Sequence, residues 1–305
     1  MLDENVMTQI HKWQSGGAFI TWRGQQIYVR EVGSGDPVLL IHGFPTSSLD
    51  WHLLEGLLAD RFRLISFDLL GFGLSDKPLA GDYRIAAQAD LAQAVLAHFG
   101  IRQCRVLAHD YGDTVAQELL ARQIDGSATF AMQQLCLLNG GLIPECHRPR
   151  LIQKLLASPL GPLIARLTSY SRFAASMRGI CTRRLAETEL QSMWELIEHN
   201  DGRRVLPQLI GYMAERRRHR ERWVGALQRA PLPLRLIDGT EDPISGAILV
   251  RGYRGLVADA DVVELAGVGH YPQLEAPEDV ARAFVEFAAR LDAAQPSVLH
   301  ARNAN

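Results

Sequence analysis

Short apolar runs alternate along the chain with longer segments whose apolar residues recur at helical spacing. Eight runs have the length and composition of β-strands: residues 18–22, 26–32, 37–43, 63–68, 104–109, 134–139, 232–238 and 261–266. Four segments have helical spacing: residues 85–99, 113–122, 246–257 and 278–291. The first two strands are close enough to form a hairpin. Nearly continuous apolar strands between amphipathic helices predict an α/β protein with a mostly parallel, eight-stranded sheet covered by helices on both faces.

Residues 146–230 break this alternation, because they contain helical stretches and no convincing strand. We interpret them as a helical lid inserted into a core domain made of residues 18–145 and 231–292, with a flexible tail at 293–305. From residue 148 to residue 230 the chain has sixteen Lys and Arg against seven Asp and Glu, a net charge of +9. The basic run at 215–222 is interpreted as a solvated helix face, with an anion-binding surface as the alternative.

The composition is that of a soluble globular protein, with 305 residues, 47% hydrophobic and 22% charged. A net charge of −2 gives no indication of nucleic-acid or membrane binding, and no apolar run is long enough to span a bilayer. The polar first residues do not read as a signal peptide, so we expect a cytoplasmic monomer or homodimer. The four cysteines, Cys104, Cys136, Cys146 and Cys181, lack metal-site spacing and are expected to be small buried residues in their reduced form.

The segment around Asp110 predicts a sharp strand-to-helix turn that exposes a nucleophile. Ala108 and Gly112 lie two residues to either side, where larger side chains would collide. The alternative is that Asp110 only caps the following helix. A carboxylate that attacks a saturated carbon forms an ester, which water can cleave, whereas a serine would form an ether. An aspartate at this turn therefore predicts displacement at an epoxide or carbon–halogen carbon.

Cleavage of such an ester by water is a second step that needs a base and an orienting acid. Candidates for both follow the last two predicted strands. His270 comes after the final strand and before the final helix, which is where a base is expected in such a sheet. Asp242 is the preferred orienting acid, and Glu241 is the nearby alternative. Asp238 lies within the predicted strand and is less well placed. The order nucleophile, acid, histidine fits a hydrolase triad.

An oxyanion hole is predicted from the backbone N–H groups of Phe44 and Tyr111. Phe44 belongs to the segment His-Gly-Phe-Pro that follows the third strand, and His42 of this segment is included among the expected site residues. Pro45 would make the loop rigid, and a cis peptide bond before it is expected.

The pieces "LLIHGFPTSSLDW", "FDLLGFGLSDKP", "LAHDYGDTVAQELL" and "GHYPQLEAPEDV" resemble the epoxide hydrolase and haloalkane dehalogenase group of α/β-hydrolases, from about residue 19 to residue 291. The pieces "HDYGD", "NGG", "HRP", "NDG" and "ERWVGAL" are similar to the mesoderm-specific transcript homologue family, even inside the lid. The resemblance implies an α/β-hydrolase fold with a small-molecule substrate and no metal or organic cofactor. It does not identify the substrate.

The resemblance to epoxide hydrolases also implies lid tyrosines that hold the epoxide oxygen and protonate the alkoxide. Tyr212 is the better candidate. For Tyr170, this role and simple packing of the ring are equally favoured. Haloalkane dehalogenases usually have a Trp after the nucleophile, where this chain has Tyr111. Two lid tryptophans, Trp194 and Trp223, could replace that donor, but packing is the preferred interpretation. Asp113 is a further departure, which either favours the helix N-terminus or crowds the nucleophile with negative charge.

Together these features predict a hydrolase that opens epoxides to vicinal diols through an ester on Asp110. One alternative is a dehalogenase that acts on a small haloalkane or haloacid with the same nucleophile. Another is a binding protein that keeps the fold without catalysis. An intact set of Asp110, Asp242 and His270 argues against this last alternative, because a binding protein needs no triad.

Overall fold

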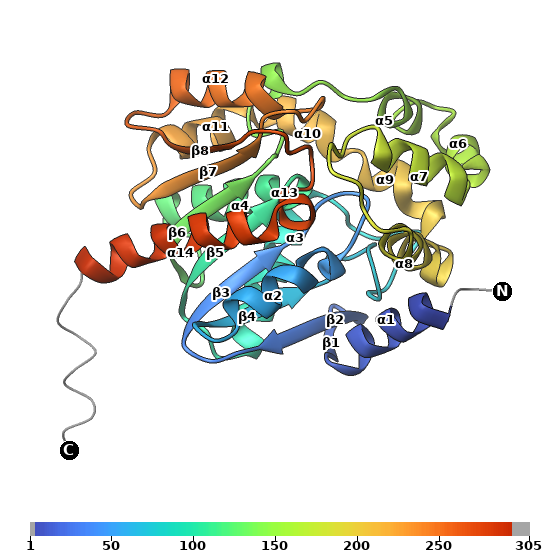
Figure 1. The fold of residues 1–305 in the computed structure, drawn as a ribbon, viewed down its shortest axis with the longest axis horizontal. Helices are drawn as coiled ribbons and strands as arrows, with labels where there is room; N and C mark the ends of the chain where they lie inside the picture. Colours follow the sequence, from blue (N-terminus) through green and yellow to red (C-terminus); the bar gives the residue numbers. More distant parts are fainter. Residues whose placement is uncertain (1–3, 295–305) are drawn as a thin grey trace.

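The computed structural model describes residues 4–294, which form an eight-stranded sheet with helices around it (Figure 1). The strands lie in the order β1-β2-β4-β3-β5-β6-β7-β8. They are β1 (Ala18–Trp22), β2 (Gln25–Val32), β3 (Asp36–Ile41), β4 (Phe62–Phe67), β5 (Gln103–His109), β6 (Ala131–Leu138), β7 (Leu234–Gly239) and β8 (Asp261–Leu265). β2 pairs antiparallel with β1 and with β4, and the remaining pairs are parallel. The sheet predicted from the apolar runs is confirmed.

Alternate residues of the central strands face two separate cores, as the period of a buried strand requires. Val38 and Leu40 of β3 pack with apolar residues of α2 and α14, whereas Leu39 and Ile41 pack with α3 and α4 on the opposite face. The helices of the core are α2 (His52–Leu58), α3 (Ile85–His98), α4 (Tyr111–Asp125), α12 (Gly246–Leu256), α13 (Pro272–Glu275) and α14 (Pro277–Ala294), with a 3₁₀ turn η1 (Ser48–Trp51). Because β3 to β8 run parallel, their carboxyl ends lie at one edge of the sheet.

Helices and turns alone occupy the described chain between β6 and β7, and they cover that edge of the sheet (Figure 1). They are η2 (Pro144–Cys146), α5 (Leu151–Leu156), α6 (Gly161–Leu167), α7 (Tyr170–Arg178), α8 (Glu187–Glu198), η3 (His199–Val205), α9 (Leu206–Leu209), α10 (Tyr212–Arg218) and α11 (Arg220–Gln228). We refer to these elements as the lid. The domain boundaries at residues 146 and 230 stay a prediction.

The N-terminal helix α1 (Glu4–Ser15) was not predicted from the sequence pattern. It packs against α8 of the lid, where the Ser192 hydroxyl donates a hydrogen bond of 2.7 Å to Gln9 Oε1. At the other end α14 continues to Ala294, beyond the predicted start of the tail at residue 293. Residues 295–305 of the predicted tail lie outside the described residues. Among residues 4–294, no helix is long and apolar enough to cross a membrane.

Candidate active site

Asp110 lies on a strained turn between β5 and α4, with φ of 46° and ψ of −102°. Residues rarely adopt such angles without a functional reason. The turn needs Gly112, because a Cβ there would lie 2.2 Å from the carbonyl oxygen of Ile41. The Asp110 side chain makes no capping hydrogen bond to the described backbone of α4, so the structure does not support the capping alternative.

The Asp110 carboxylate is held between the core and the lid, and only 3% of the residue is exposed. The Phe44 backbone N–H donates to Oδ2 across 3.2 Å. The Arg216 guanidinium donates from Nη2 to the Asp110 carbonyl oxygen at 2.8 Å and lies 3.4 Å from Oδ1. The Phe44–Pro45 peptide bond is cis, as expected. Tyr111, the other predicted oxyanion donor, is the first residue of α4 and directly follows the nucleophile.

His270 and Asp242 are joined by a hydrogen bond of 2.8 Å between Nδ1 and Oδ2. The Asp242 carboxylate also accepts hydrogen bonds from the backbone N–H groups of Ile244 and Ser245, at 2.8 Å and 3.2 Å. Glu241, the alternative acid, is exposed to solvent. The structure therefore pairs the histidine with Asp242.

Asn139 holds this acid in place, a role that the sequence analysis did not assign. It lies directly after β6, with φ of 41°, and its Nδ2 donates to Asp242 Oδ2 and to the Gly239 carbonyl, both at 3.1 Å. Its Oδ1 accepts from the Gly239 N–H at 2.8 Å. The available signal was its position at the end of a central strand, where polar residues meet the site.

The charges of the triad support one another despite their burial. Burial raises the pKa of Asp110, but Arg216 and His270 outweigh it, so the pKa of that carboxyl is lowered and it stays ionised. Burial likewise acts against charge on His270, but Asp242 and then Asp110 raise the pKa of His270 to about 9. Burial also raises the pKa of Asp242, but His270 outweighs it and lowers that pKa to about 2.

If the chain hydrolyses an ester on Asp110, as the sequence predicts, these charges set the pH dependence of that hydrolysis, the second chemical step. His270 acts as a base only when neutral, so kcat should rise with pH as His270 loses its proton and then reach a plateau. Esterification of Asp110 removes one of the charges that raise the pKa of His270, so the midpoint should lie below about 9. Steady-state kcat measured across pH checks this, and kcat/KM, which reports the first step, should lack the rise. In an Asp242→Asn variant the midpoint should move lower still.

Arg216 corrects the interpretation of the basic run at 215–222 as a solvated helix face. Arg222 and Arg220 do lie toward the surface, bound to Glu118 and Glu145. Arg216 is 2% exposed, and its Nε donates to Thr114 Oγ1 at 2.7 Å beside the nucleophile. The signal missed was its spacing, because Arg216 follows Tyr212 by four residues and shares its helix face.

Tyr212, the preferred lid tyrosine, is buried beside the nucleophile. Its ring lies 6.0 Å from that of Phe44 and 5.0 Å from that of Tyr111, and the Arg216 guanidinium stacks 4.4 Å from its centre. Within residues 4–294 its hydroxyl makes no hydrogen bond. Burial and the Asp110 charge raise the pKa of this phenol, so it keeps its proton.

Tyr170 is not brought to this site. It begins α7 on the outside of the lid, where its hydroxyl donates to Glu187. The sequence favoured Tyr212 by its place before the basic run, but only the packing of the lid decides which tyrosine turns inward.

His42 is also placed differently from the prediction, because both ring nitrogens bond to the backbone of neighbouring loops. Nε2 accepts from the Leu69 N–H at 3.1 Å, so Nδ1 bears the proton and donates to the Gly43 carbonyl at 2.8 Å. The imidazole thus links the loop that carries Phe44 to the loop at Leu69 by hydrogen bonds. Of the lid tryptophans, Trp223 packs on the core and donates to Glu118, and Trp194 lines the cavity described next.

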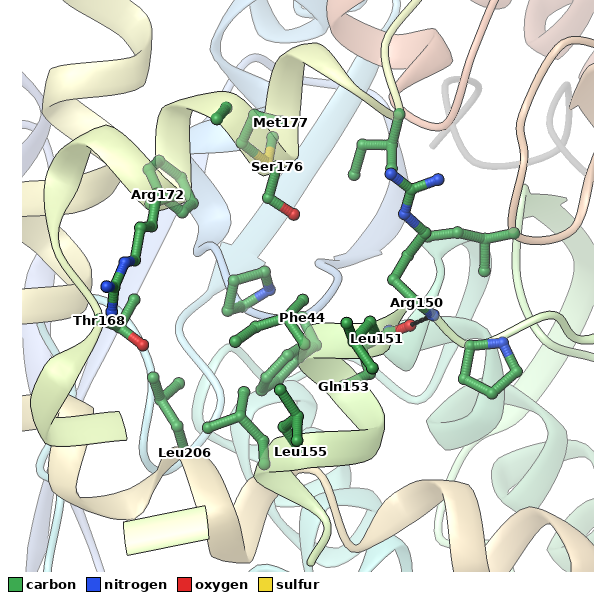
Figure 2. A pocket seen from close by; sticks show the side chains of 18 of the residues that line it. Phe44, Arg150, Leu151, Gln153, Leu155, Thr168, Arg172, Ser176, Met177 and Leu206 are labelled. Atoms are coloured by element: carbon green, nitrogen blue, oxygen red, sulfur yellow. Dashed lines mark hydrogen bonds between the residues drawn. The ribbon is translucent and has the colours of Figure 1, made fainter. Parts of the chain in front are cut away.

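A cavity of about 780 Å³ lies between the lid and the core, and Phe44 and His270 form part of its wall. Most of the wall is apolar and comes from the lid. Three arginines, Arg148, Arg150 and Arg172, also line it, and no acidic residue of the described chain does. Figure 2 shows Phe44 near the middle, with Arg150 and Arg172 on opposite sides. Asp110 and Tyr212 are not part of the wall, but each contacts Phe44, which is.

The loop that carries His270 is fastened to the lid through Glu275. The Glu275 carboxylate accepts from the backbone N–H groups of Thr182, Arg183 and Gly269, at 2.7 Å, 2.8 Å and 3.0 Å. The His270 N–H donates to the Ile180 carbonyl at 2.9 Å. The backbone between α7 and α8 of the lid is therefore tied by hydrogen bonds to the loop that carries His270. Over the described residues, no cluster of His, Cys, Asp and Glu has the makings of a metal site.

Comparison with known proteins places this geometry in context. Residues 38–283 match the model of the alpha/beta hydrolase family. The chain is 41% identical over 292 residues to the mesoderm-specific transcript homolog protein of Bos taurus, covering 91% of this chain and 87% of the relative. It is 42% identical over 278 residues to the putative hydrolase LipZ of Mycobacterium tuberculosis, covering 90% and 96%.

Two solved structures share the fold at low sequence identity. The haloalkane dehalogenase DbeA from Bradyrhizobium elkani has a TM-score of 0.77 and 23% identity, with 91% of this chain and 99% of that chain covered. The epoxide hydrolase CorEH has a TM-score of 0.73 and 18% identity, with 90% and 99% covered.

Proposed function

This chain belongs to the alpha/beta hydrolase family, and from that premise we propose that it opens epoxides to vicinal diols through an ester on Asp110. The observation that carries the proposal is the buried hydroxyl of Tyr212, which makes no hydrogen bond within residues 4–294 and lies close enough to the Asp110 carboxylate to feel its charge. An acid that can protonate a leaving oxygen is what ring opening requires, and displacement of a halide has no use for it.

In the first step an Asp110 oxygen attacks a ring carbon and the carbon–oxygen bond of the epoxide breaks. The Phe44 N–H holds Oδ2, so Oδ1 is the attacking oxygen. Tyr212 donates a hydrogen bond to the leaving oxygen and then its proton. The reactive end of the substrate enters from the cavity past Phe44 and His270, while the apolar lid residues hold its remainder.

In the second step His270, oriented by Asp242, removes a proton from water, and the resulting hydroxide attacks the Asp110 carbonyl carbon. The Phe44 N–H already contacts Oδ2, the oxygen that becomes negative in the tetrahedral intermediate. A preorganised donor at this position stabilises the developing charge. Breakdown of the intermediate cleaves the bond between the carbonyl carbon and Oδ1, and the departing oxygen takes the proton from His270. The diol leaves, and the new carboxylic acid loses its proton to restore the carboxylate.

A single turnover in ¹⁸O-water, with enzyme in excess over an epoxide, tests the ester mechanism. The hydroxyl that Asp110 supplies to the diol carries the original ¹⁶O, and ¹⁸O enters the Asp110 carboxylate instead. Mass spectrometry of the diol and of the peptide containing Asp110 measures both. Label in the diol with none in the peptide would show that water attacks the epoxide directly, which contradicts the proposal.

A Tyr212→Phe variant should lower kcat for epoxides by about 10²- to 10³-fold, the usual contribution of a general acid. The ring and its packing against Phe44 and Tyr111 stay in place, so the loss reports the hydroxyl alone. Tyr170→Phe is the matched control, because that hydroxyl bonds to Glu187 on the lid surface. Initial rates of diol formation for both variants check this, and equal losses would remove Tyr212 from the mechanism.

A dehalogenase that acts on an anionic halogenated compound is the second candidate, and Arg216 favours it. Among residues 4–294 its Nη1 has no hydrogen-bond partner, so this buried cation could receive a halide or carboxylate. The expected tryptophan donor is absent: the Tyr111 hydroxyl donates to the Tyr83 carbonyl at 3.2 Å. Halide release from haloalkanes and haloacids, measured beside diol formation, distinguishes the two candidates.

A further inference from the structure

Asp113 is a buried carboxyl group that the mechanism above leaves unused. It lies in the first turn of α4, three residues after the nucleophile, and is 0% exposed. Neither carboxyl oxygen has a hydrogen-bond partner in the described chain, which is unusual for a buried polar group. Its neighbour Arg216 has an unpartnered nitrogen of its own, Nη1.

These two unpartnered groups lie against consecutive glycines at the end of β6. A Cβ on Gly140 would lie 2.1 Å from Asp113 Oδ2, and a Cβ on Gly141 would lie 2.1 Å from Arg216 Nη1. The Arg216 Nε also bonds to Thr114, the residue after Asp113. Asp113 and Asp110 are therefore two carboxyl groups near one arginine. Arg216 is paired with Asp110 and makes no ion pair with Asp113 among the described residues, although its charge acts on both.

The charged groups around Asp113 come from several elements. Burial is the largest influence and raises its pKa well above the ordinary value, and Asp110 raises it further. Arg216 and the backbone at Leu138 of β6 lower the pKa, and Asp238 of β7 raises it. The Cys136 thiol of β6 and the Tyr253 phenol of α12 face it as neutral groups. Asp113 thus holds a proton while Asp110 is ionised, and Asp110 is the counter-ion of Arg216.

Formation of the ester on Asp110 changes this balance. The ester is neutral, so the buried Arg216 guanidinium loses the carboxylate that compensates its charge. An uncompensated buried charge is strongly unfavourable. The same event removes the negative charge that opposes ionisation of Asp113.

We propose that Asp113 exchanges charge with Asp110 during catalysis, giving up its proton when Asp110 becomes an ester and replacing it as the counter-ion of Arg216. This inference rests on the proposed alkylation of Asp110. Asp113 acts through Arg216 and is a positioning residue that also stores a proton.

The protons balance over the cycle. In the first step a carbon–oxygen bond of the epoxide breaks, the Asp110 ester forms, and the alkoxide takes up one proton while Asp113 loses one. In the second step hydrolysis of the ester restores the Asp110 carboxylate and releases one proton, which Asp113 takes back. The buried cluster of Asp110, Asp113 and Arg216 keeps the same net charge throughout.

Infrared spectroscopy tests the exchange without any substrate, using an Asp110→Asn variant as a neutral mimic of the ester. The protonated Asp113 carboxyl should give a C=O stretch that shifts on ¹³C labelling of aspartate and is absent in Asp113→Asn. The same band should disappear in Asp110→Asn. Asp238→Asn is the matched control, because Asp238 is a second buried, unpartnered carboxyl whose pKa burial and Asp242 raise to about 8. An Asp113 band that persists in Asp110→Asn, or is missing in the unmodified protein, overturns the proposal.

Proton counting during adduct formation gives the second readout, in a His270→Gln background with a pH-indicator dye. With an epoxide we expect no net proton uptake per adduct, and uptake of one proton per adduct once Asp113→Asn is added. With a haloalkane we expect release of one proton per adduct in the His270→Gln background, and no release once Asp113→Asn is added. The difference between the two backgrounds is one proton for either chemistry, and equal counts overturn the exchange. If neither substrate class forms an adduct, the proposed function fails, and the infrared result still decides the charge exchange.

Discussion

A His270→Gln variant incubated with an epoxide substrate should accumulate a covalent adduct on Asp110. The first step needs only the ionised carboxylate and the Tyr212 hydroxyl. Arg216, which lowers the pKa of Asp110 more than His270 does, remains in the variant, so we expect the carboxylate to stay ionised. The second step needs a base to activate water, and glutamine cannot remove a proton. General-base catalysis contributes about 10²- to 10⁴-fold, so we expect kcat to fall by about 10³-fold or more and the ester to persist.

Intact-protein mass spectrometry measures the adduct as a mass increase equal to the whole epoxide, and peptide mapping assigns it to Asp110. His98→Gln is a suitable control, because His98 is an exposed residue at the end of α3. The control should turn over normally and accumulate nothing. An adduct that forms with a haloalkane and releases halide, but never with an epoxide, would favour the dehalogenase.

An Asp110→Asn variant should lose turnover almost completely, by at least about 10⁴-fold in kcat, because it removes the nucleophile on which both steps depend. The amide is nearly isosteric and can still accept the Phe44 N–H bond, so the loss should reflect chemistry. Diol formation and adduct formation should fall together, unlike in His270→Gln.

Asp125→Asn is the matched control for this variant, because Asp125 ends the same helix at the surface. Thermal unfolding and circular dichroism of both variants should show that the fold persists. If Asp110→Asn retained turnover within about tenfold of the unmodified protein, the carboxylate would not be the nucleophile and another group, or water itself, would attack the substrate.

The strands, the turn at Asp110 and the triad order could all be derived from the sequence, because each depends on local pattern or on chain order. The small residues Ala108 and Gly112 mark a turn of a few residues, and the structure gives it the strained angles expected of a nucleophile. Parallel strands bring their carboxyl ends together, so residues after β5, β7 and β8 had to meet. The pairing of Asp242 with His270 then follows from the topology of the sheet.

The positions of the lid side chains could be predicted only in part from the sequence, because its short helices have apolar residues on several faces. Tyr212 and Tyr170 occupy equivalent positions at the start of helices, yet one is buried at the nucleophile and the other bonds to Glu187 at the surface. Arg216 belongs to a run of charges that composition assigns to solvent, and it is 2% exposed. His42 has the expected sequence position, but its nitrogens are taken by backbone groups of two loops.

The sequence by itself therefore determined the sheet, the sharp turn at Asp110 and the chemistry that a carboxylate at that turn can perform. Only the tertiary structure decided which lid residues accompany Asp110, and that Arg216 is the buried cation paired with it. The physical reason is that strand period and chain order act over a few residues or through fixed topology. Whether one charged side chain is buried depends instead on how separate helices pack, and on whether an opposite charge lies at the buried position.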